Sequence, residues 1–108
     1  MNMREILTLG PVMPVIVIDD AELAVPLARA LLEGGIRVLE VTLRTDAALE
    51  AIRRIAREVP EAVVGAGTVL DAASVSSARA AGARFGVSPG TTPELLAALS
   101  GSNWPFLP

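Results

Sequence analysis

The chain has 108 residues, enough for one domain with a moderate core, and its hydrophobic fraction of 52% is typical of a globular protein rather than a disordered one. The net charge of −3 gives no electrostatic basis for binding nucleic acid or an anionic membrane, and no apolar run approaches the length of a membrane span. The sequence contains no cysteine, histidine, lysine or tyrosine, which excludes disulfides and thiolate chemistry, fits a cytoplasmic protein, and leaves only Asp, Glu, Arg, Ser and Thr for polar chemistry.

Strand-like apolar runs follow one another at nearly regular intervals. They begin near Val12, Arg37, Ala62, Arg84 and Pro105, so the intervals are 25, 25, 22 and 21 residues. This is the length of a compact unit of strand, loop, helix and loop. The pattern predicts four βα units and the start of a fifth strand.

The first interval predicts a helix with recognisable ends. Asp19 and Glu22 have the spacing of a capping box, and Gly34-Gly35 would end the helix. Pro26 falls inside this helix and should either kink it or shift its start, because proline lacks the backbone N–H that a helix interior requires.

The later intervals carry helix signals as well. The second helix is expected at residues 46–59, where apolar residues recur at helical spacing. The candidate ends of the other two are Asp71 and Gly82 for the third helix, and Thr91 or Thr92, followed by Pro93, for the fourth.

Strands that alternate with helices at this spacing predict a parallel sheet with right-handed crossovers. Two folds compete, a closed (β/α)8 TIM barrel and an open doubly wound sheet. Residues 104–108 read as a strand that begins and is then cut off, and the chain has about half of the roughly 250 residues of a typical barrel. We therefore expect residues 1–108 to be the N-terminal half of a single (β/α)8 barrel domain.

Polar and apolar side chains alternate along residues 38–44. One face of this predicted strand carries leucine and valine, and the other carries Glu40, Thr42 and Arg44. A parallel strand between two helices should be covered on both faces, so a carboxylate there is the best acid–base candidate. Burial would raise the pKa of Glu40, and the nearby Arg44 would lower it. An edge strand with both residues in water explains the same pattern equally well.

Three other polar or glycine-rich segments give weaker signals. Residues 65–68 (Gly65-Ala66-Gly67-Thr68) favour close packing of the backbone over a ligand site. They lack the third glycine of a dinucleotide fingerprint and the Gly-Lys of a P-loop. Ser88-Pro89-Gly90 is more typical of a turn than of the wall of a binding site. Asp19-Asp20 could suggest a metal ligand, but helix capping explains the pair better.

Taken together, four segments closely resemble the bacterial 2-keto-3-deoxy-6-phosphogluconate aldolases, a class I family whose members often also cleave 4-hydroxy-2-oxoglutarate. The similarity runs from about Gly10 to the last residue. The segments are Gly10-Pro11-Val12-Met13-Pro14-Val15-Ile16, Leu39-Glu40-Val41-Thr42-Leu43-Arg44-Thr45, Val64-Gly65-Ala66-Gly67-Thr68-Val69-Leu70 and Ser88-Pro89-Gly90. Arg44 favours this family over the related phosphogalactonate aldolases.

The resemblance implies a (β/α)8 barrel, usually in a homotrimer, whose lysine on the sixth strand forms a Schiff base with a 2-keto acid substrate. Carried over by motif, Glu40 would shuttle protons, and Arg44 and Thr68 would bind the pyruvyl carboxylate. The resemblance implies no cofactor and no metal. The family's lysine and phosphate site would both fall after Pro108, so this chain would lack the nucleophile and be inactive alone.

Two other functions remain open at this point. The chain could be a non-catalytic open-sheet module for binding or assembly, or another barrel enzyme that uses a carboxylate with a metal. The absence of histidine and of clustered carboxylates disfavours the metal enzyme. A half-barrel would leave strand edges and an apolar interior uncovered, so we expect the isolated chain to self-associate, to stay partly unfolded or to pair with a supplied second half.

Overall fold

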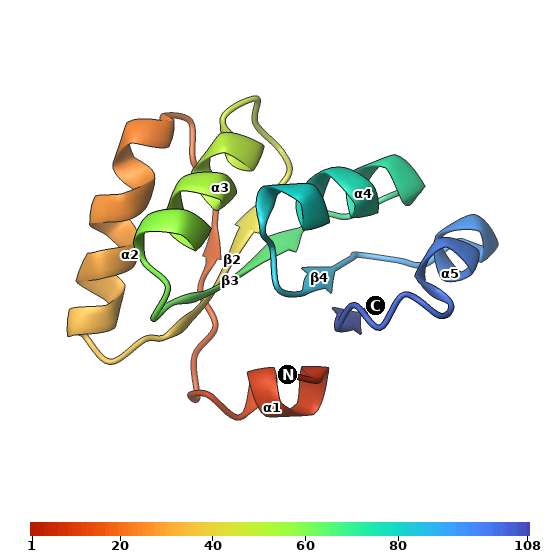
Figure 1. Cartoon of the computed structure of the whole chain (residues 1–108), viewed down its shortest axis with the longest axis horizontal. Helices are drawn as coiled ribbons and strands as arrows, with labels where there is room; N and C mark the ends of the chain where they lie inside the picture. Colours follow the sequence, from red (N-terminus) through yellow and green to blue (C-terminus); the bar gives the residue numbers. More distant parts are fainter.

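Helices and short parallel strands alternate along the chain in the computed structural model, which describes all residues from Met1 to Pro108 (Figure 1). The strands are β1 (Val15–Ile16), β2 (Val38–Thr42), β3 (Val63–Gly67), β4 (Gly86–Val87) and β5 (Phe106–Leu107). The helices are α1 (Met3–Leu7), the 3-10 turn η1 (Ala21–Leu23), α2 (Ala24–Glu33), α3 (Ala48–Glu58), α4 (Ala72–Ala81) and α5 (Pro93–Leu99). None of the helices is long and apolar enough to cross a membrane.

The sheet settles the choice between the two predicted folds. Its strands lie in the order β1-β2-β3-β4-β5, and every neighbouring pair is parallel. In a doubly wound sheet the strand order reverses partway, so a strictly sequential order excludes that alternative. Sequential parallel strands are the arrangement of a barrel wall, and the sheet here is open at β1 and β5.

The strand positions agree with the sequence predictions except at the first strand. The strands β2 to β5 begin within two residues of the expected starts, but β1 begins at Val15 rather than near Val12. Pro11 and Pro14 explain the delay, because proline has no N–H to donate to a ladder. Pro14 still contributes its carbonyl oxygen, which accepts a hydrogen bond of 3.0 Å from the Glu40 backbone N–H.

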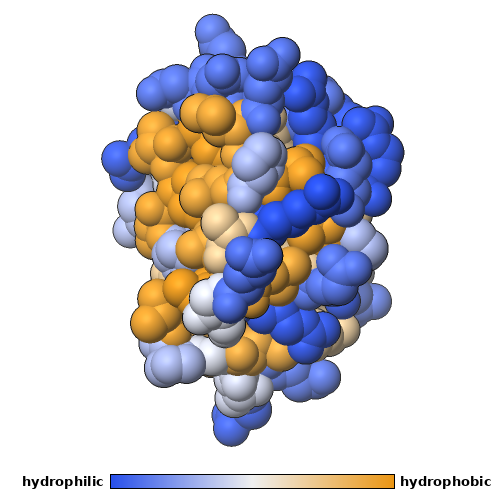
Figure 2. Space-filling view, turned by 90° about the vertical axis from the view of Figure 1, so that its left-hand side faces the viewer, coloured by the Kyte–Doolittle hydropathy of each residue, from blue (hydrophilic) through white to orange (hydrophobic).

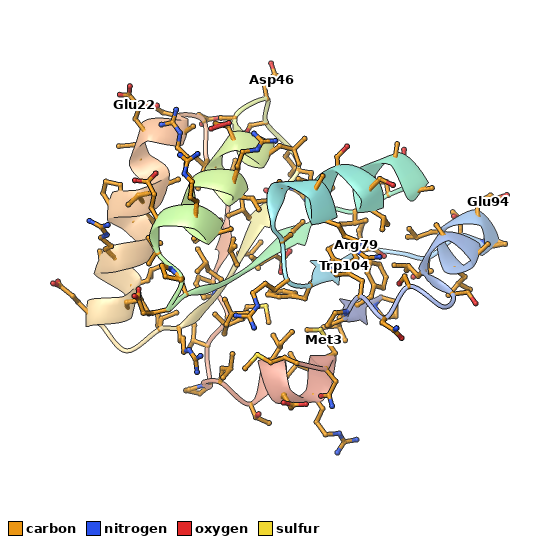
Figure 3. The ribbon with its side chains drawn as sticks, viewed as in Figure 1. Met3, Glu22, Asp46, Arg79, Glu94 and Trp104 are labelled. Atoms are coloured by element: carbon orange, nitrogen blue, oxygen red, sulfur yellow. The ribbon has the colours of Figure 1, made fainter.

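The outer face of the sheet and the helices α2 to α5 share the main core. This cluster holds 20 buried residues, almost all aliphatic, with alanine frequent where helices approach the sheet. Leu39 and Val41 of β2 belong to it, as the predicted alternation requires. Trp104 closes the cluster beside β4 and β5, and its indole N–H donates to the Ala83 carbonyl at 3.0 Å (Figure 3).

The start of α2 corrects the predicted capping box. Asp20, not Asp19, is the cap: its side chain accepts from the Glu22 backbone N–H at 3.0 Å and begins η1. The α-helix itself starts only at Ala24, which puts Pro26 in its first turn. Of the two predicted effects of Pro26, a shifted start is therefore the observed one, since the first turn needs no donor at that position.

The other helix ends are close to the predicted ones. α3 runs from Ala48 to Glu58, slightly shorter than the expected 46–59 and without a side-chain cap. Asp71 caps α4 by accepting from the Ser74 N–H at 2.8 Å, and Gly82 ends it with a left-handed backbone at φ 101°. Of the two threonines proposed for α5, Thr92 is the cap.

The short helix α1 was not predicted from the sequence. Asn2 and Glu5 form a reciprocal capping box that starts it. Its Ile6 packs against the inner face of the sheet, with Val38, Val63 and Phe85 in a second, smaller cluster. α1 therefore closes the end of the sheet at which the strands begin (Figure 1).

The rest of the inner face and the β1 edge are open. Val15 and Val17 are 64% and 55% exposed, and Leu107 of β5 is exposed at the opposite edge. Register places Val15 beside Glu40, on the face away from the helices. The side of the molecule on which α2 lies is also broadly apolar (Figure 2). Exposed apolar surfaces of this kind are typical of contacts with other protein segments or chains.

Candidate functional site

Glu40 lies on a central strand and faces inward. β2 is hydrogen-bonded to β1 on one side and to β3 on the other, and Glu40 is only 7% exposed. Leu39 and Val41 point to the helices, so Glu40 and Thr42 point to the inner face. The edge-strand interpretation is therefore wrong for Glu40.

The carboxylate of Glu40 has no hydrogen-bond partner within the chain, although every fully buried polar side-chain atom does have one. Its oxygens must therefore retain contact with solvent on the open inner face. Burial raises the pKa of Glu40 above its ordinary value, and the positive charge of Arg44 acts in the opposite direction with a smaller effect. A carboxyl group with a raised pKa that keeps access to solvent on an open face is suited to take up and release protons.

Arg44 and Thr68 come together although they are 24 residues apart. The Arg44 Nε–H donates to the Thr68 hydroxyl at 3.2 Å, just beyond the carboxyl ends of β2 and β3. Thr68 has φ 59°, a left-handed backbone that is rare for a β-branched residue. Arg44 is exposed, so its guanidinium retains donors for a ligand at this end of the sheet. The structure thus brings together the guanidinium and the hydroxyl that the sequence had singled out.

Two further threonines, neither of them predicted as a site residue, hold the same end of the sheet. The Thr42 hydroxyl donates to the Ile16 carbonyl at 3.2 Å, and the Thr45 hydroxyl donates to the Ile18 carbonyl. Each bond joins the end of β2 to the end of β1 across more than 25 residues of chain. The alternation along β2 is the only sequence signal that predicts an inward-facing Thr42. No feature of the neighbouring sequence distinguishes Thr45.

The weaker motifs have structural roles. The Ser88 hydroxyl donates to the Gly90 carbonyl, which makes residues 88–90 a tight turn, as predicted. Asp20 is a helix cap, and no group of three or more acidic side chains converges anywhere in the chain in a way that could hold a metal ion.

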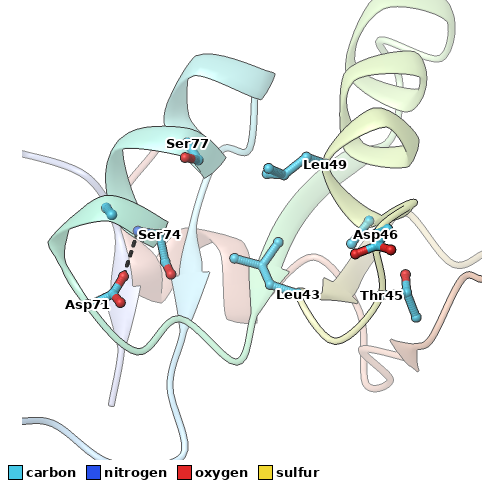
Figure 4. A pocket seen from close by; sticks show the side chains of 9 residues that line it. Leu43, Thr45, Asp46, Leu49, Asp71, Ser74 and Ser77 are labelled. Carbon is cyan, nitrogen blue, oxygen red and sulfur yellow. Dashed lines mark hydrogen bonds between the residues drawn. The ribbon is translucent and has the colours of Figure 1, made fainter.

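The pocket of the chain lies away from Glu40. It has a volume of about 380 Å³ and sits in the outer layer between the starts of α3 and α4 (Figure 4). Its polar lining includes Asp46 and Ser77, and Asp71, which is engaged as the α4 cap. Neither Glu40 nor Arg44 lines it. We place the candidate site on the inner face instead, since that face carries the perturbed carboxyl group and is open rather than pocket-shaped.

Comparison with known proteins identifies the family of this chain. Residues 3–108 match the family model for KDPG and KHG aldolase. The chain is 57% identical over 105 residues to the KHG/KDPG aldolase of Escherichia coli K12, which covers 97% of this chain and 49% of that protein. It is 59% identical over 94 residues to the 2-dehydro-3-deoxy-phosphogluconate aldolase of Zymomonas mobilis, covering 87% of this chain and 45% of that protein.

Solved structures agree with the fold. The 2-keto-3-deoxy-6-phosphogluconate aldolase of Zymomonas mobilis superposes with a TM-score of 0.94 at 51% identity, covering 100% of this chain and 52% of that one. The KDPG aldolase of Legionella pneumophila, with pyruvate captured as a covalent carbinolamine intermediate, gives 0.96 at 46% identity and the same coverage. The chain spans about half the length of the relatives it matches, and its five strands correspond to half of their TIM barrel. The chain belongs to the KDPG and KHG aldolase family.

Proposed function

We propose that residues 1–108 form the N-terminal half of a single barrel domain in a class I aldolase. The whole enzyme would cleave 2-keto-3-deoxy-6-phosphogluconate to pyruvate and glyceraldehyde 3-phosphate, and 4-hydroxy-2-oxoglutarate to pyruvate and glyoxylate. The family match supports the reaction class. The observation that carries the proposal is the inward-facing Glu40, whose pKa is raised by burial, near the carboxyl ends of the strands, where TIM-barrel active sites lie.

In this proposal Glu40 moves protons for the Schiff-base chemistry. When an amine adds to the substrate ketone, the nitrogen must lose a proton and the new alkoxide must gain one to give the carbinolamine. The carbinolamine hydroxyl must then be protonated to leave as water. One carboxyl group can serve both steps if its pKa lies close enough to neutrality to give and accept protons, and burial moves the pKa of Glu40 in that direction.

Arg44 and Thr68 would bind the carboxylate of the keto acid. A guanidinium offers paired N–H donors to a carboxylate, and the Thr68 hydroxyl already orients the Arg44 Nε. This leaves the terminal nitrogens of Arg44 for the substrate. The geometry would hold the pyruvyl end near Glu40, at the mouth of the sheet.

The nucleophilic lysine cannot come from these 108 residues, because they contain none. We propose that both the lysine and the phosphate site belong to a part of the enzyme outside this chain, and that the chain alone is inactive. The α-amino group of Met1 is a poor substitute, since Schiff-base amines are activated by desolvation and charged neighbours.

Trapping with borohydride tests whether the Schiff-base nucleophile lies outside this chain. The chain is incubated with pyruvate, reduced with borohydride and examined by mass spectrometry, with the full-length aldolase of Escherichia coli as the positive control. We expect an adduct on the control and none on any side chain of this protein. A reduced adduct on a side chain of the chain would overturn the assignment of the nucleophile to another segment.

We further propose that the complete enzyme works in the cytoplasm as a homotrimer and that the isolated chain self-associates. The exposed Val15 and Val17 and the unpaired edges of β1 and β5 support self-association. Light scattering across a concentration series should show species larger than the monomer, and Trp104 emission should report whether the β4–β5 end stays buried. A monodisperse monomer at every concentration would favour the non-catalytic open-sheet module.

A further inference from the structure

The Glu40 side chain does not lie over its own register partner. On the neighbouring strand, Glu40 pairs with Gly65, but its carboxyl group lies over Gly67, two residues further along β3. A Cβ atom built on Gly67 would fall 1.9 Å from Glu40 Oε1, 2.7 Å from Cδ and 2.9 Å from Cγ. The side chain therefore leans towards the carboxyl ends of the strands and occupies the space that a side chain at position 67 would need.

The backbone of Gly67 does not explain why glycine stands there. Its φ is not in the left-handed region, in contrast to Gly82 and two other glycines of the chain. Gly67 is also the last residue of a central strand, where glycine weakens the strand by its entropy and its lack of side-chain packing. The close approach of Glu40 is the contact that requires the missing Cβ.

Gly65 provides a matched comparison on the same face of the same strand. A Cβ there would lie 2.3 Å from the Phe85 ring, which is fully buried in the inner apolar cluster. The ring fills the space over Gly65, so Glu40 finds room only over Gly67. Gly65 thus leaves room for the Phe85 ring, and Gly67 leaves room for the Glu40 carboxyl group.

We propose that Gly67 is a positioning residue that seats the Glu40 carboxyl group on the inner face and directs it towards the mouth of the sheet. We call this contact of the Glu40 carboxyl group over Gly67 the seat of Glu40. Its existence does not depend on the proposed function, whereas its use in proton transfer rests on that function. A side chain at position 67 would displace the Glu40 carboxyl group from its present place over Gly67.

A double-mutant cycle on the 108-residue chain tests the seat without substrate. The four proteins are the unaltered chain, Gly67→Ala, Glu40→Ala and the double variant, and urea unfolding is followed by circular dichroism. We expect Gly67→Ala to lower the unfolding midpoint when Glu40 is present. In the Glu40→Ala background the loss should vanish or reverse, because Gly→Ala in a strand is otherwise favourable.

The control is Gly65→Ala, which clashes with Phe85 and should be as harmful with Glu40 present as without it. A Gly67→Ala chain that fails to fold, rescued by Glu40→Ala, would support the seat as well. An equal loss in both backgrounds, or failure of both to fold, would overturn it.

A second measurement separates positioning from general stability. In a folded Gly67→Ala chain, NMR titration should show the pKa of Glu40 falling towards its ordinary value, because the displaced carboxyl group is better solvated. Thr92→Ala, which removes the α5 cap, should lower stability and leave the pKa of Glu40 unchanged. An unchanged Glu40 pKa in Gly67→Ala would overturn the proposal. Loss of the aldolase assignment would alter neither readout.

Discussion

The two ends of the inner face differ in the type of side chain that the strands carry. Where the strands begin, Ile6 of α1 covers Val38, Val63 and Phe85, and all four are fully buried. Where the strands end, Glu40 lies on the open part of the inner face, and the Arg44–Thr68 pair lies just beyond β2 and β3. The strands and their alternation are common to both ends, so the difference lies in the residue types and in α1. In this chain one end of the sheet carries an apolar cluster, and the other carries the candidate site.

The boundary between the two ends lies between Gly65 and Gly67. The Phe85 ring rests over Gly65 and the Glu40 carboxyl group rests over Gly67, one pleat further along. The apolar cluster therefore ends one pleat before the carboxyl group. Burial there is a sufficient physical reason for the raised pKa of Glu40.

The largest effect is expected at the apolar end. Phe85→Ala should lower the free energy of unfolding by about 3–5 kcal/mol, because it removes a fully buried ring and leaves a cavity under α1. Urea unfolding measures the loss, with Phe85→Leu as a milder control. A loss below about 1 kcal/mol would show that α1 does not close this end tightly.

At the polar end, Glu40→Gln should lower kcat of the complete enzyme by roughly 100-fold or more, because glutamine keeps the shape and loses the transferable proton. The assay follows pyruvate release from the aldol substrate. The unfolding midpoint of the variant at low pH, where Glu40 is neutral as well, serves as the control. An unchanged kcat would remove Glu40 from the proton-transfer role.

Arg44→Ala should act mainly on KM for the keto acid, raising it about tenfold or more, since a charge-assisted carboxylate contact contributes to ground-state binding. Arg44→Lys should recover only part of the loss, because an ammonium cannot reproduce the guanidinium fork. A fall in kcat at constant KM would instead place Arg44 in the reacting step.

The outer layer should respond weakly and without touching the site. Thr92→Ala removes the hydroxyl that accepts from the Leu95 N–H at 3.1 Å and should cost about 1 kcal/mol of stability. Urea unfolding gives the loss, while kcat of the complete enzyme should remain unchanged. A fall in kcat that the loss of stability does not explain would show that α5 is coupled to the polar end.

The smallest effect is the pH dependence that Glu40 imposes on stability. Its pKa is higher in the folded state than in the unfolded one, so the folded chain holds the proton more tightly between the two values. Stability should therefore fall as the pH rises from the unfolded pKa through the folded pKa. Glu40→Gln should be more stable than the unaltered chain above that window and equal to it below. Parallel profiles for the two proteins would contradict the buried position of Glu40.

The features that could be predicted from the sequence depend on neighbours in the chain. Asp71 caps α4 through an N–H three residues away, and Thr92 does the same for α5, so residue type and spacing sufficed. The regular spacing of apolar runs located β2 to β5, and the LEVTLRT and VGAGTVL motifs pointed to the family. The alternation along β2 also placed Glu40 and Leu39 on opposite faces.

Other features depended on register between distant segments. Nothing within a few residues of Gly67 shows that Glu40 will lie over it, or that Arg44 will reach Thr68 across 24 residues. The capping box of α1 is local, but its place beneath Phe85 is decided by packing. Local hydrogen bonds and periodicity determined the elements, their order and the family. The seat of Glu40, the closed end and the open end were decided only when the parallel register brought the strands together, because side chains on adjacent strands meet only through that register.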